Sequence, residues 1–319
     1  MARLSRARTA AGGVWWLAIL LCLFLAGCET SHLDLDALIK MGRSMKAFDH
    51  KGLVIRYQEA GEGRPVILIH GYGASSYTWR NLVGPLAEKY QVFALDLKGF
   101  GFSDKPEDDR YSIADQAEIV AAFIEEKGLT GVTLVGNSMG GAVAMMTWMD
   151  LNHGPDGPVE RLVLIDSAAY KQKLPSFIWA ASIPWLNRLS GWLLSPRFTA
   201  ELVLKQCYYE DDKLTEAQVM VYAAYLELPG SRYALMKTAQ QIVPPNTEEL
   251  TGQLGRISVP VLVIWGEEDE VIAPHLGHRL ANDILGARLV IIPKCGHLPQ
   301  EERPQKVLEL IKNFLKEQD

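Results

Sequence analysis

Residues 132–141 read VTLVGNSMGG, and this stretch decides the fold. Its first four residues are all strand-forming and mostly apolar, which indicates a strand buried on both faces of a parallel sheet. The thirteen residues 139–151 that follow the serine are predicted to form a helix. Glycines at 136 and 140 let neighbouring backbone approach closely, so the chain can turn sharply from strand to helix. The pattern G-x-S-x-G in this context is predicted to lift the Ser138 hydroxyl out of the sheet.

Similar apolar runs recur on both sides of this stretch and predict the rest of a sheet. A pair of strands around a polar turn is predicted first, and five buried strands share the pattern of 132–135. Between them lie stretches with helical composition, one of which has Ser112 and Asp115 in capping-box spacing. Strands alternating with helices predict an α/β fold with a doubly wound, mostly parallel sheet. The predicted strands are 45–48, 53–58, 65–69, 92–95, 132–135, 162–165, 261–264 and 289–292, and the predicted helices are 112–126, 139–151 and 304–316.

One segment, residues 168–245, interrupts this alternation. It has no clear buried strand, and its pattern is helical. We expect it to form a helical cap over the carboxyl edge of the sheet, where open α/β sheets bind their ligands. The core would then comprise residues 44–167 and 246–319.

A serine hydroxyl is a weak nucleophile and needs a base within hydrogen-bonding reach. His297 is the best candidate, because it follows the last predicted strand in a Cys-Gly-His loop before the final helix. The base in turn needs a carboxylate to orient it. Asp269, after the penultimate strand, is favoured over its rival Asp166, because the order Ser, Asp, His then places acid and base after the last two strands.

Acyl transfer also requires donors for a developing oxyanion. The loop His70-Gly71-Tyr72-Gly73 follows the first buried strand, and we predict the backbone N–H groups of Tyr72 and Met139 as the donor pair. The alternative is that the glycines serve only the conformation of the loop. His70 itself is expected to be a structural hydrogen-bonding residue.

Taken together, these motifs resemble the α/β-hydrolase superfamily over residues 45–319. The resemblance rests on the segments 70–73, 96–104, 136–141, 266–269 and 296–297. Within that superfamily, the Gly-Asn-Ser-Met-Gly-Gly turn resembles bacterial lipases and esterases and monoacylglycerol lipases. The resemblance implies a serine hydrolase that cleaves carboxylic esters with an apolar acyl group through an acyl-enzyme, with no cofactor.

Other members of the superfamily provide alternatives. Carbon–carbon bond hydrolases share the turn but usually carry a tryptophan after the catalytic histidine, where this chain has Leu298. Haloalkane dehalogenases and epoxide hydrolases use an aspartate nucleophile where this chain has Ser138. Carbon–carbon bond hydrolysis and cofactor-free perhydrolysis on the same three residues stay open. A hydrolase-like protein that binds without catalysis is the third reading, and the intact set of residues speaks against it.

The first 27 residues resemble a bacterial lipoprotein signal peptide. Three arginines precede an apolar run at 14–26, which ends in Leu-Ala-Gly before Cys28. We expect lipidation at Cys28, a tether over 28–43, and a membrane-anchored enzyme whose catalytic domain lies outside the cytoplasm. An uncleaved membrane anchor is the alternative, although the run is shorter than the roughly 20 residues that a span needs.

Composition excludes other classes of function. With 48% hydrophobic residues, 22% charged residues and a net charge of −6, the chain is a globular protein with no signal for binding nucleic acid. No cysteine and histidine pattern suggests a metal site, so no metal and no cofactor are expected. Cys207 and Cys295 are either two free thiols or one disulfide. Acyl length, alcohol group and oligomeric state stay open.

The predicted cap carries the only sequence signal for the substrate. Residues 177–194 contain one charged residue, Arg188, among many large apolar ones, including Trp179, Trp185 and Trp192. These side chains could line an acyl pocket, lie on a membrane, or pack the cap onto the core.

Overall fold

The computed structural model describes residues 42, 44–152 and 157–317. The predicted signal peptide, the lipidation site Cys28 and nearly all of the predicted tether lie outside these ranges. Within them, no helix combines the length and the apolar character needed to cross a bilayer.

Eight strands form one sheet in the order β1-β2-β4-β3-β5-β6-β7-β8. The hairpin of β1 and β2 is antiparallel, β2 runs antiparallel to β4, and β3 to β8 run parallel to one another. The predicted α/β fold with a mostly parallel sheet is therefore confirmed. The strands are β1 (Lys46–His50), β2 (Leu53–Ala60), β3 (Pro65–Ile69), β4 (Gln91–Leu95), β5 (Val132–Asn137), β6 (Val159–Ile165), β7 (Val261–Gly266) and β8 (Arg288–Ile292).

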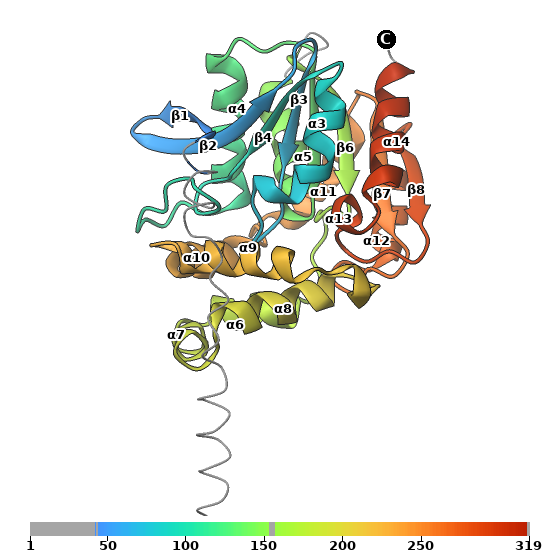
Figure 1. The fold of residues 1–319 in the computed structure, drawn as a ribbon. Helices are drawn as coiled ribbons and strands as arrows, with labels where there is room; N and C mark the ends of the chain where they lie inside the picture. The colour runs from blue at the N-terminus through green and yellow to red at the C-terminus, as the bar shows by residue number, and fades with distance from the viewer. Residues whose placement is uncertain (1–41, 43, 153–156, 318–319) are drawn as a thin grey trace, which may run out of the picture.

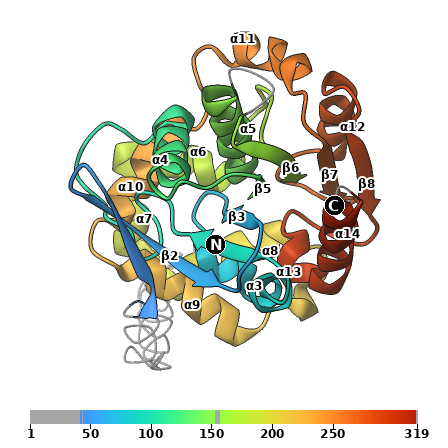
Figure 2. The same ribbon diagram turned by 90° about the horizontal axis from the view of Figure 1, so that it is seen from above.

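Helices cover both faces of the sheet (Figure 2). Successive residues of β3 belong to opposite faces, and this explains why its apolar run has no polar interruption. Val66 and Leu68 pack in a core with α3 (Arg80–Ala87) and α14 (Pro304–Lys316). Ile67 and Ile69 pack on the other face, in a core with α4 (Ile113–Glu126), α5 (Met139–Leu151) and α12 (Pro274–Asp283).

Local sequence signals account for the ends of several helices. The side chain of Ser112 accepts a hydrogen bond from the N–H of Asp115, and the Asp115 carboxylate accepts one from the N–H of Ser112. This is the predicted capping box, and it starts α4. The bounds of α5 and α14 match the predicted ranges, whereas α3 and α12 were not predicted.

The chain between β6 and β7 is helical. It forms α6 (Ser176–Ser182), α7 (Pro184–Leu193), α8 (Pro196–Cys207), α9 (Glu216–Glu227), α10 (Ser231–Gln241) and α11 (Thr247–Gly252), with short 3-10 turns at Asp211–Lys213 and Leu254–Arg256. In Figure 1, α6 to α10 form a layer across the end of the sheet toward which β6 points. The helices α6 to α10 all fall within the segment 168–245.

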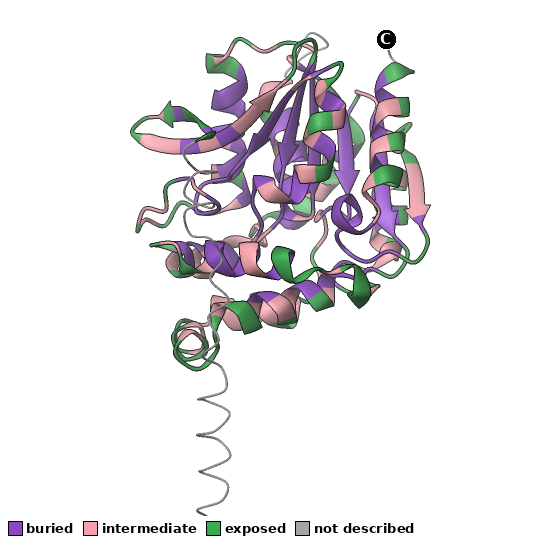
Figure 3. Cartoon of the chain, in the orientation of Figure 1, coloured by how far each residue is buried: buried purple, intermediate pink, exposed green. Residues whose placement is uncertain are grey.

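Three tryptophans of this layer face outward. Trp179, Trp185 and Trp192 are 55%, 66% and 82% exposed, and α7 is largely exposed in Figure 3. Packing of the cap onto the core, one of the alternatives for residues 177–194, is therefore wrong for these three side chains. Ile178 in the same segment is buried.

Candidate active site

Ser138 occupies a strained turn between β5 and α5. Its φ of 55° and ψ of −120° lie in a region that non-glycine residues rarely adopt, at a cost of roughly 1–3 kcal/mol. Neighbouring backbone holds it there: its N–H donates to the carbonyl of Ile165 at 2.9 Å, and its carbonyl accepts from Gly141 and Ala168 at 3.0 Å. The surrounding structure thus fixes a conformation that exposes the serine side chain at the end of the sheet.

The glycines on either side of Ser138 have no space for a side chain. A Cβ on Gly136 would lie 2.2 Å from the carbonyl oxygen of Gly140. A Cβ on Gly140 would lie 2.2 Å from the carbonyl oxygen of Ile69 and 2.6 Å from that of His70. All of these neighbours are backbone atoms, which cannot rotate away.

We therefore expect Gly140→Ala to lower the free energy of unfolding by about 3 kcal/mol, the upper end of the cost of overpacking. The matched control is Gly252→Ala at the end of α11, where a Cβ meets nothing within 4 Å. Its effect should stay within about 0.5 kcal/mol. Urea unfolding of the two variants measures both values, and equal destabilisation would contradict the packing argument.

His297 and Asp269 form a buried hydrogen-bonded pair. The Nδ1 of His297 lies 2.8 Å from Oδ2 of Asp269, and both side chains are almost wholly buried. The other carboxylate oxygen, Oδ1, accepts from the N–H groups of Val271 at 2.8 Å and Ile272 at 2.9 Å. Because the carboxylate can only accept from the imidazole, Nδ1 carries the proton and Nε2 is left able to accept one.

Ser138 and His297 line the same cavity, whose volume is about 280 Å³. No hydrogen bond joins the Ser138 hydroxyl to the imidazole in the part of the chain that the structure describes. A hydrogen bond between a general base and the hydroxyl that it activates is often long in a structure without ligand, and it tightens when substrate binds. Of the three residues predicted from the sequence, Asp269 and His297 are joined by a hydrogen bond, and Ser138 lines the same cavity as His297.

Asp166, the rival carboxylate, lies beside this pair but is not bonded to the imidazole. Its Oδ1 accepts from the N–H of Gly266 at 2.8 Å, and its Oδ2 has no hydrogen-bond partner in the described structure. Burial and then the neighbouring charge of Asp269 raise the pKa of Asp166 well above its usual range. The site therefore favours the neutral acid at Asp166.

Asp166, Asp269 and His297 are also close enough to share a cation, since one ligand atom of each lies within 4.8 Å of the others. However, Nδ1 of His297 already donates to Asp269, and a neutral Asp166 is a poor ligand. The arrangement fits proton transfer better than metal binding.

The loop after β3 faces Ser138. Tyr72 and the glycines around it line the cavity that contains Ser138, and Gly73 has a φ of 72°. The phenol of Tyr72 donates to the carbonyl of Leu235 at 3.0 Å, which ties the loop to α10. Met139 begins α5, so its N–H is one of the amides that find no partner within the helix. These are the two residues predicted to supply the oxyanion donors.

His70 has the structural role expected for it. Its Nε2 accepts from the N–H of Leu97 at 3.0 Å, and its Nδ1–H donates to the carbonyl of Gly71 at 2.7 Å. Complete burial lowers the pKa of His70 to about 4, so the ring is neutral at physiological pH. The neutral ring fixes the start of the loop that carries Tyr72.

Two positioning residues were missed by sequence reasoning. Asn137 donates from Nδ2 to the carbonyls of Ile165 and His297, both at 3.2 Å, and so ties the end of β5, directly before Ser138, to the loop that carries His297. The buried carboxylate of Glu302 accepts from Gly296 N–H at 2.7 Å and Glu210 N–H at 2.9 Å. No local signal marks either role, because each contact joins distant segments.

The neighbouring Glu301 ties the cap to the core. Its buried carboxylate accepts from hydroxyls and a guanidinium on both sides of the junction, namely Thr78 at 2.7 Å, Arg80 at 2.8 Å, Tyr208 at 3.1 Å and Tyr222 at 2.5 Å. With this many donors, the cost of removing the Glu301 carboxylate from water is compensated.

The two cysteines of the predicted globular part, Cys207 and Cys295, are buried free thiols, so the disulfide alternative is wrong.

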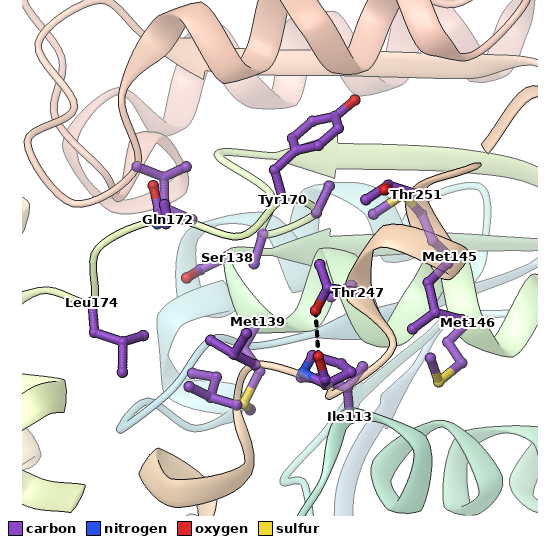
Figure 4. Close-up of a pocket in the computed structure, with 18 of the residues that line it drawn as sticks. Ile113, Ser138, Met139, Met145, Met146, Tyr170, Gln172, Leu174, Thr247 and Thr251 are labelled. Atoms are coloured by element: carbon purple, nitrogen blue, oxygen red, sulfur yellow. Dashed lines mark hydrogen bonds between the residues drawn. The ribbon is translucent and has the colours of Figure 1, made fainter. Parts of the chain in front are cut away.

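A second cavity, of about 100 Å³, meets the first at Ser138. We call it the methionine cavity because four methionines of α5 line it, and we call the first one the His297 cavity. Figure 4 shows the methionine cavity with Ser138 on one side and Met145 and Met146 on the other. Its lining also includes Met139, Met149, Ala142, Ile242, Pro244, Leu250 and Leu254. The His297 cavity is lined mainly by α6, α7 and α8.

Comparison with known proteins gives one family and several relatives. The family model for the alpha/beta hydrolase fold matches residues 64–304. Lipase 3 of Moraxella sp. (strain TA144) is 28% identical over 90% of this chain and 92% of its own length. The 2-hydroxy-6-oxo-6-(2'-aminophenyl)hexa-2,4-dienoic acid hydrolase of Metapseudomonas resinovorans is 30% identical over 83% of this chain and 88% of its own. The crystal structure of a bacterial membrane phospholipase A is similar with a TM-score of 0.71 and 27% identity, over 95% of this chain and 98% of that one.

Proposed function

Because the chain belongs to the α/β-hydrolase family, we propose that it hydrolyses carboxylic esters with an apolar acyl group, with Ser138 as the nucleophile. The observation that carries the proposal is the buried His297–Asp269 hydrogen bond of 2.8 Å in a site whose cavity is shared with Ser138. An oriented imidazole that shares a cavity with a partly exposed serine is the arrangement that can activate a hydroxyl.

The proposed reaction has two halves. In the first, Oγ of Ser138 bonds to the ester carbonyl carbon while Nε2 of His297 takes the hydroxyl proton. The carbon–oxygen bond to the alcohol then breaks, and His297 returns the proton to the leaving oxygen. In the second, a water molecule bonds to the acyl carbon, loses its proton to His297, and Ser138 leaves with that proton.

Backbone hydrogen-bond donors and one carboxylate stabilise the charges that develop in both halves. The negative oxygen of each tetrahedral intermediate would accept from the backbone amides of Tyr72 and Met139, the latter at the N-terminus of α5. The ionised Asp269 stabilises the positive imidazolium that forms in the same steps.

The lining of the two cavities supports an uncharged, apolar substrate. In the described structure, Arg232 is the one lysine or arginine among the lining residues, and its Nη1 already donates to the carbonyl of Asn187 at 2.9 Å. The remaining lining is mostly hydrocarbon and thioether. Such surfaces bind acyl chains by removing apolar area from water.

Carbon–carbon bond hydrolysis is the second candidate, because the relative from Metapseudomonas resinovorans is named for a dienoic acid. Such a substrate carries a carboxylate, which needs a cation or several donors when buried. Leu298, next to His297 in the lining of the His297 cavity, offers neither, and the guanidinium of Arg232 in the same lining already donates to the carbonyl of Asn187. The ester is therefore the better match to this site.

The test compares purified protein on p-nitrophenyl acetate, butyrate and octanoate with its action on a vinylogous diketone. We expect kcat/KM for the best ester to exceed that for the diketone by about 100-fold or more, as expected when a site is built for one substrate class. Faster cleavage of the diketone would favour the second candidate. Absence of turnover together with no labelling by a fluorophosphonate would favour a binding protein.

A further inference from the structure

Ser138 lies where two separate cavities meet. The methionine cavity and the His297 cavity share Ser138, Ile178 and Val271. An acyl carbon bonded to Oγ of Ser138 would therefore have open space in two directions. An ester carries one substituent on each side of its carbonyl carbon, so each cavity can receive one of them.

The methionine cavity offers a ligand almost no free polar group. Its four polar side chains other than Ser138 are already hydrogen-bonded within the protein: Tyr170 to Asp283 at 2.7 Å, Gln172 to the carbonyl of Val271 at 3.4 Å, Thr247 to that of Pro244 at 2.5 Å and Thr251 to that of Glu248 at 3.1 Å. The bond of Thr247 is drawn in Figure 4. What remains is hydrocarbon and thioether, which suits an unbranched apolar chain.

The shape of α5 gives this cavity a direction. Ala142, Met145, Met146 and Met149 follow the spacing i, i+3, i+4, i+7 and so lie on one face of the helix. Ala142 is one turn from Ser138, and Met149 lies about 10 Å further along the axis at 1.5 Å per residue. The cavity thus extends away from the nucleophile along the helix.

The position of the base decides which substituent enters which cavity. His297 must return a proton to the leaving alcohol, so the alcohol oxygen has to lie beside its imidazole. His297 lines the larger cavity and is not among the residues that line the methionine cavity. The alcohol part therefore faces α6, α7 and α8, and the acyl part faces the opposite way.

On this basis, and resting on the proposed ester hydrolysis, we propose that the methionine cavity is the acyl-chain subsite and the His297 cavity is the alcohol subsite. The substrates would be esters with an apolar group on both sides of the carbonyl. The larger cavity then allows the bulkier group on the alcohol side.

The experiment uses the same substitution in each cavity. Ala142→Leu adds three carbons to the methionine cavity near Ser138, and Ala181→Leu adds them to the His297 cavity from α6. Each variant is assayed on two series: p-nitrophenyl acetate to octanoate, and acetate esters of methanol, hexanol and 2-naphthol. Met149→Ala, which enlarges the far end of the methionine cavity, is the second variant in case Ala142→Leu fails to fold.

We expect Ala142→Leu to lower the octanoate-to-acetate ratio of kcat/KM about tenfold or more and leave the ratios of the alcohol series within about twofold. Ala181→Leu should do the reverse, and Met149→Ala should raise the octanoate ratio. Exchanged effects, or equal effects on both series, would overturn the assignment of the two subsites. A wild-type protein that cleaves none of these esters would overturn the proposed function itself, which is a distinguishable result.

Discussion

Ser138→Ala is expected to lower kcat for ester hydrolysis by about 10⁶-fold, the size of loss measured when a serine hydrolase loses its nucleophile. Alanine keeps the Cβ, so the φ of 55° stays equally strained and the turn is unchanged. The effect should therefore appear in kcat without a loss of the folded state. Steady-state kinetics with p-nitrophenyl butyrate, together with thermal unfolding, measures both.

Ser176→Ala is the control for this variant. Ser176 is exposed at the start of α6 and lines neither of the two cavities. A fluorophosphonate should label the wild-type protein and the Ser176 variant but not the Ser138 variant. Retention of more than about one-hundredth of the activity by Ser138→Ala would show that another group attacks the ester, since the loss would then be far below that of a nucleophile.

The strands of the sheet and the helices α4, α5 and α14 could be predicted from the sequence, because the residue patterns that mark them are local. The apolar run of β3 and the capping box of α4 lie within a few residues of the elements that they define. The helix α3 was missed, and Gly84 and Pro85 within it explain why, because both residues disfavour a helix interior. The pattern of α12 was likewise not recognised.

Positions that depend on tertiary contacts could not be predicted in the same way. Asn137 stands at a variable position of the G-x-S-x-G pattern, and its role comes from a bond to the carbonyl of His297, 160 residues away. Each of the two cavities is enclosed by several elements that lie far apart in the sequence, so no single stretch of residues predicts its shape. Both Asp166 and Asp269 follow strands of the sheet, and chain order could only favour one of them.

Asp269→Asn should lower kcat by about 10⁴-fold, the loss seen when a triad carboxylate becomes an amide. The remaining oxygen would stay on the N–H groups of Val271 and Ile272, which turns the amide NH₂ toward His297. That NH₂ donates, so Nδ1 of His297 must accept and its proton moves to Nε2. In this tautomer the imidazole cannot take the proton of Ser138. Pre-steady-state measurement of p-nitrophenol release reports the loss directly.

Asp166→Asn distinguishes the role of Asp166 from that of Asp269. It should reduce kcat less than about tenfold, because an amide resembles the neutral acid that burial favours at this position. A loss near 10⁴-fold would instead make Asp166 the orienting carboxylate.

The same variant should also change how the stability of the protein depends on pH. The pKa of Asp166 is raised by burial, then by the charge of Asp269, so above pH 3.8 the unfolded chain releases a proton that the folded protein keeps. This group therefore lowers wild-type stability as pH rises from 3.8 toward the raised pKa, by up to about 1.4 kcal/mol per pH unit. Asparagine removes that slope, so the stability of the variant relative to wild type should increase between pH 5 and pH 8 in urea unfolding. A constant difference across this range would mean that Asp166 titrates alike in both states, and that the neutral acid beside Asp269 does not exist.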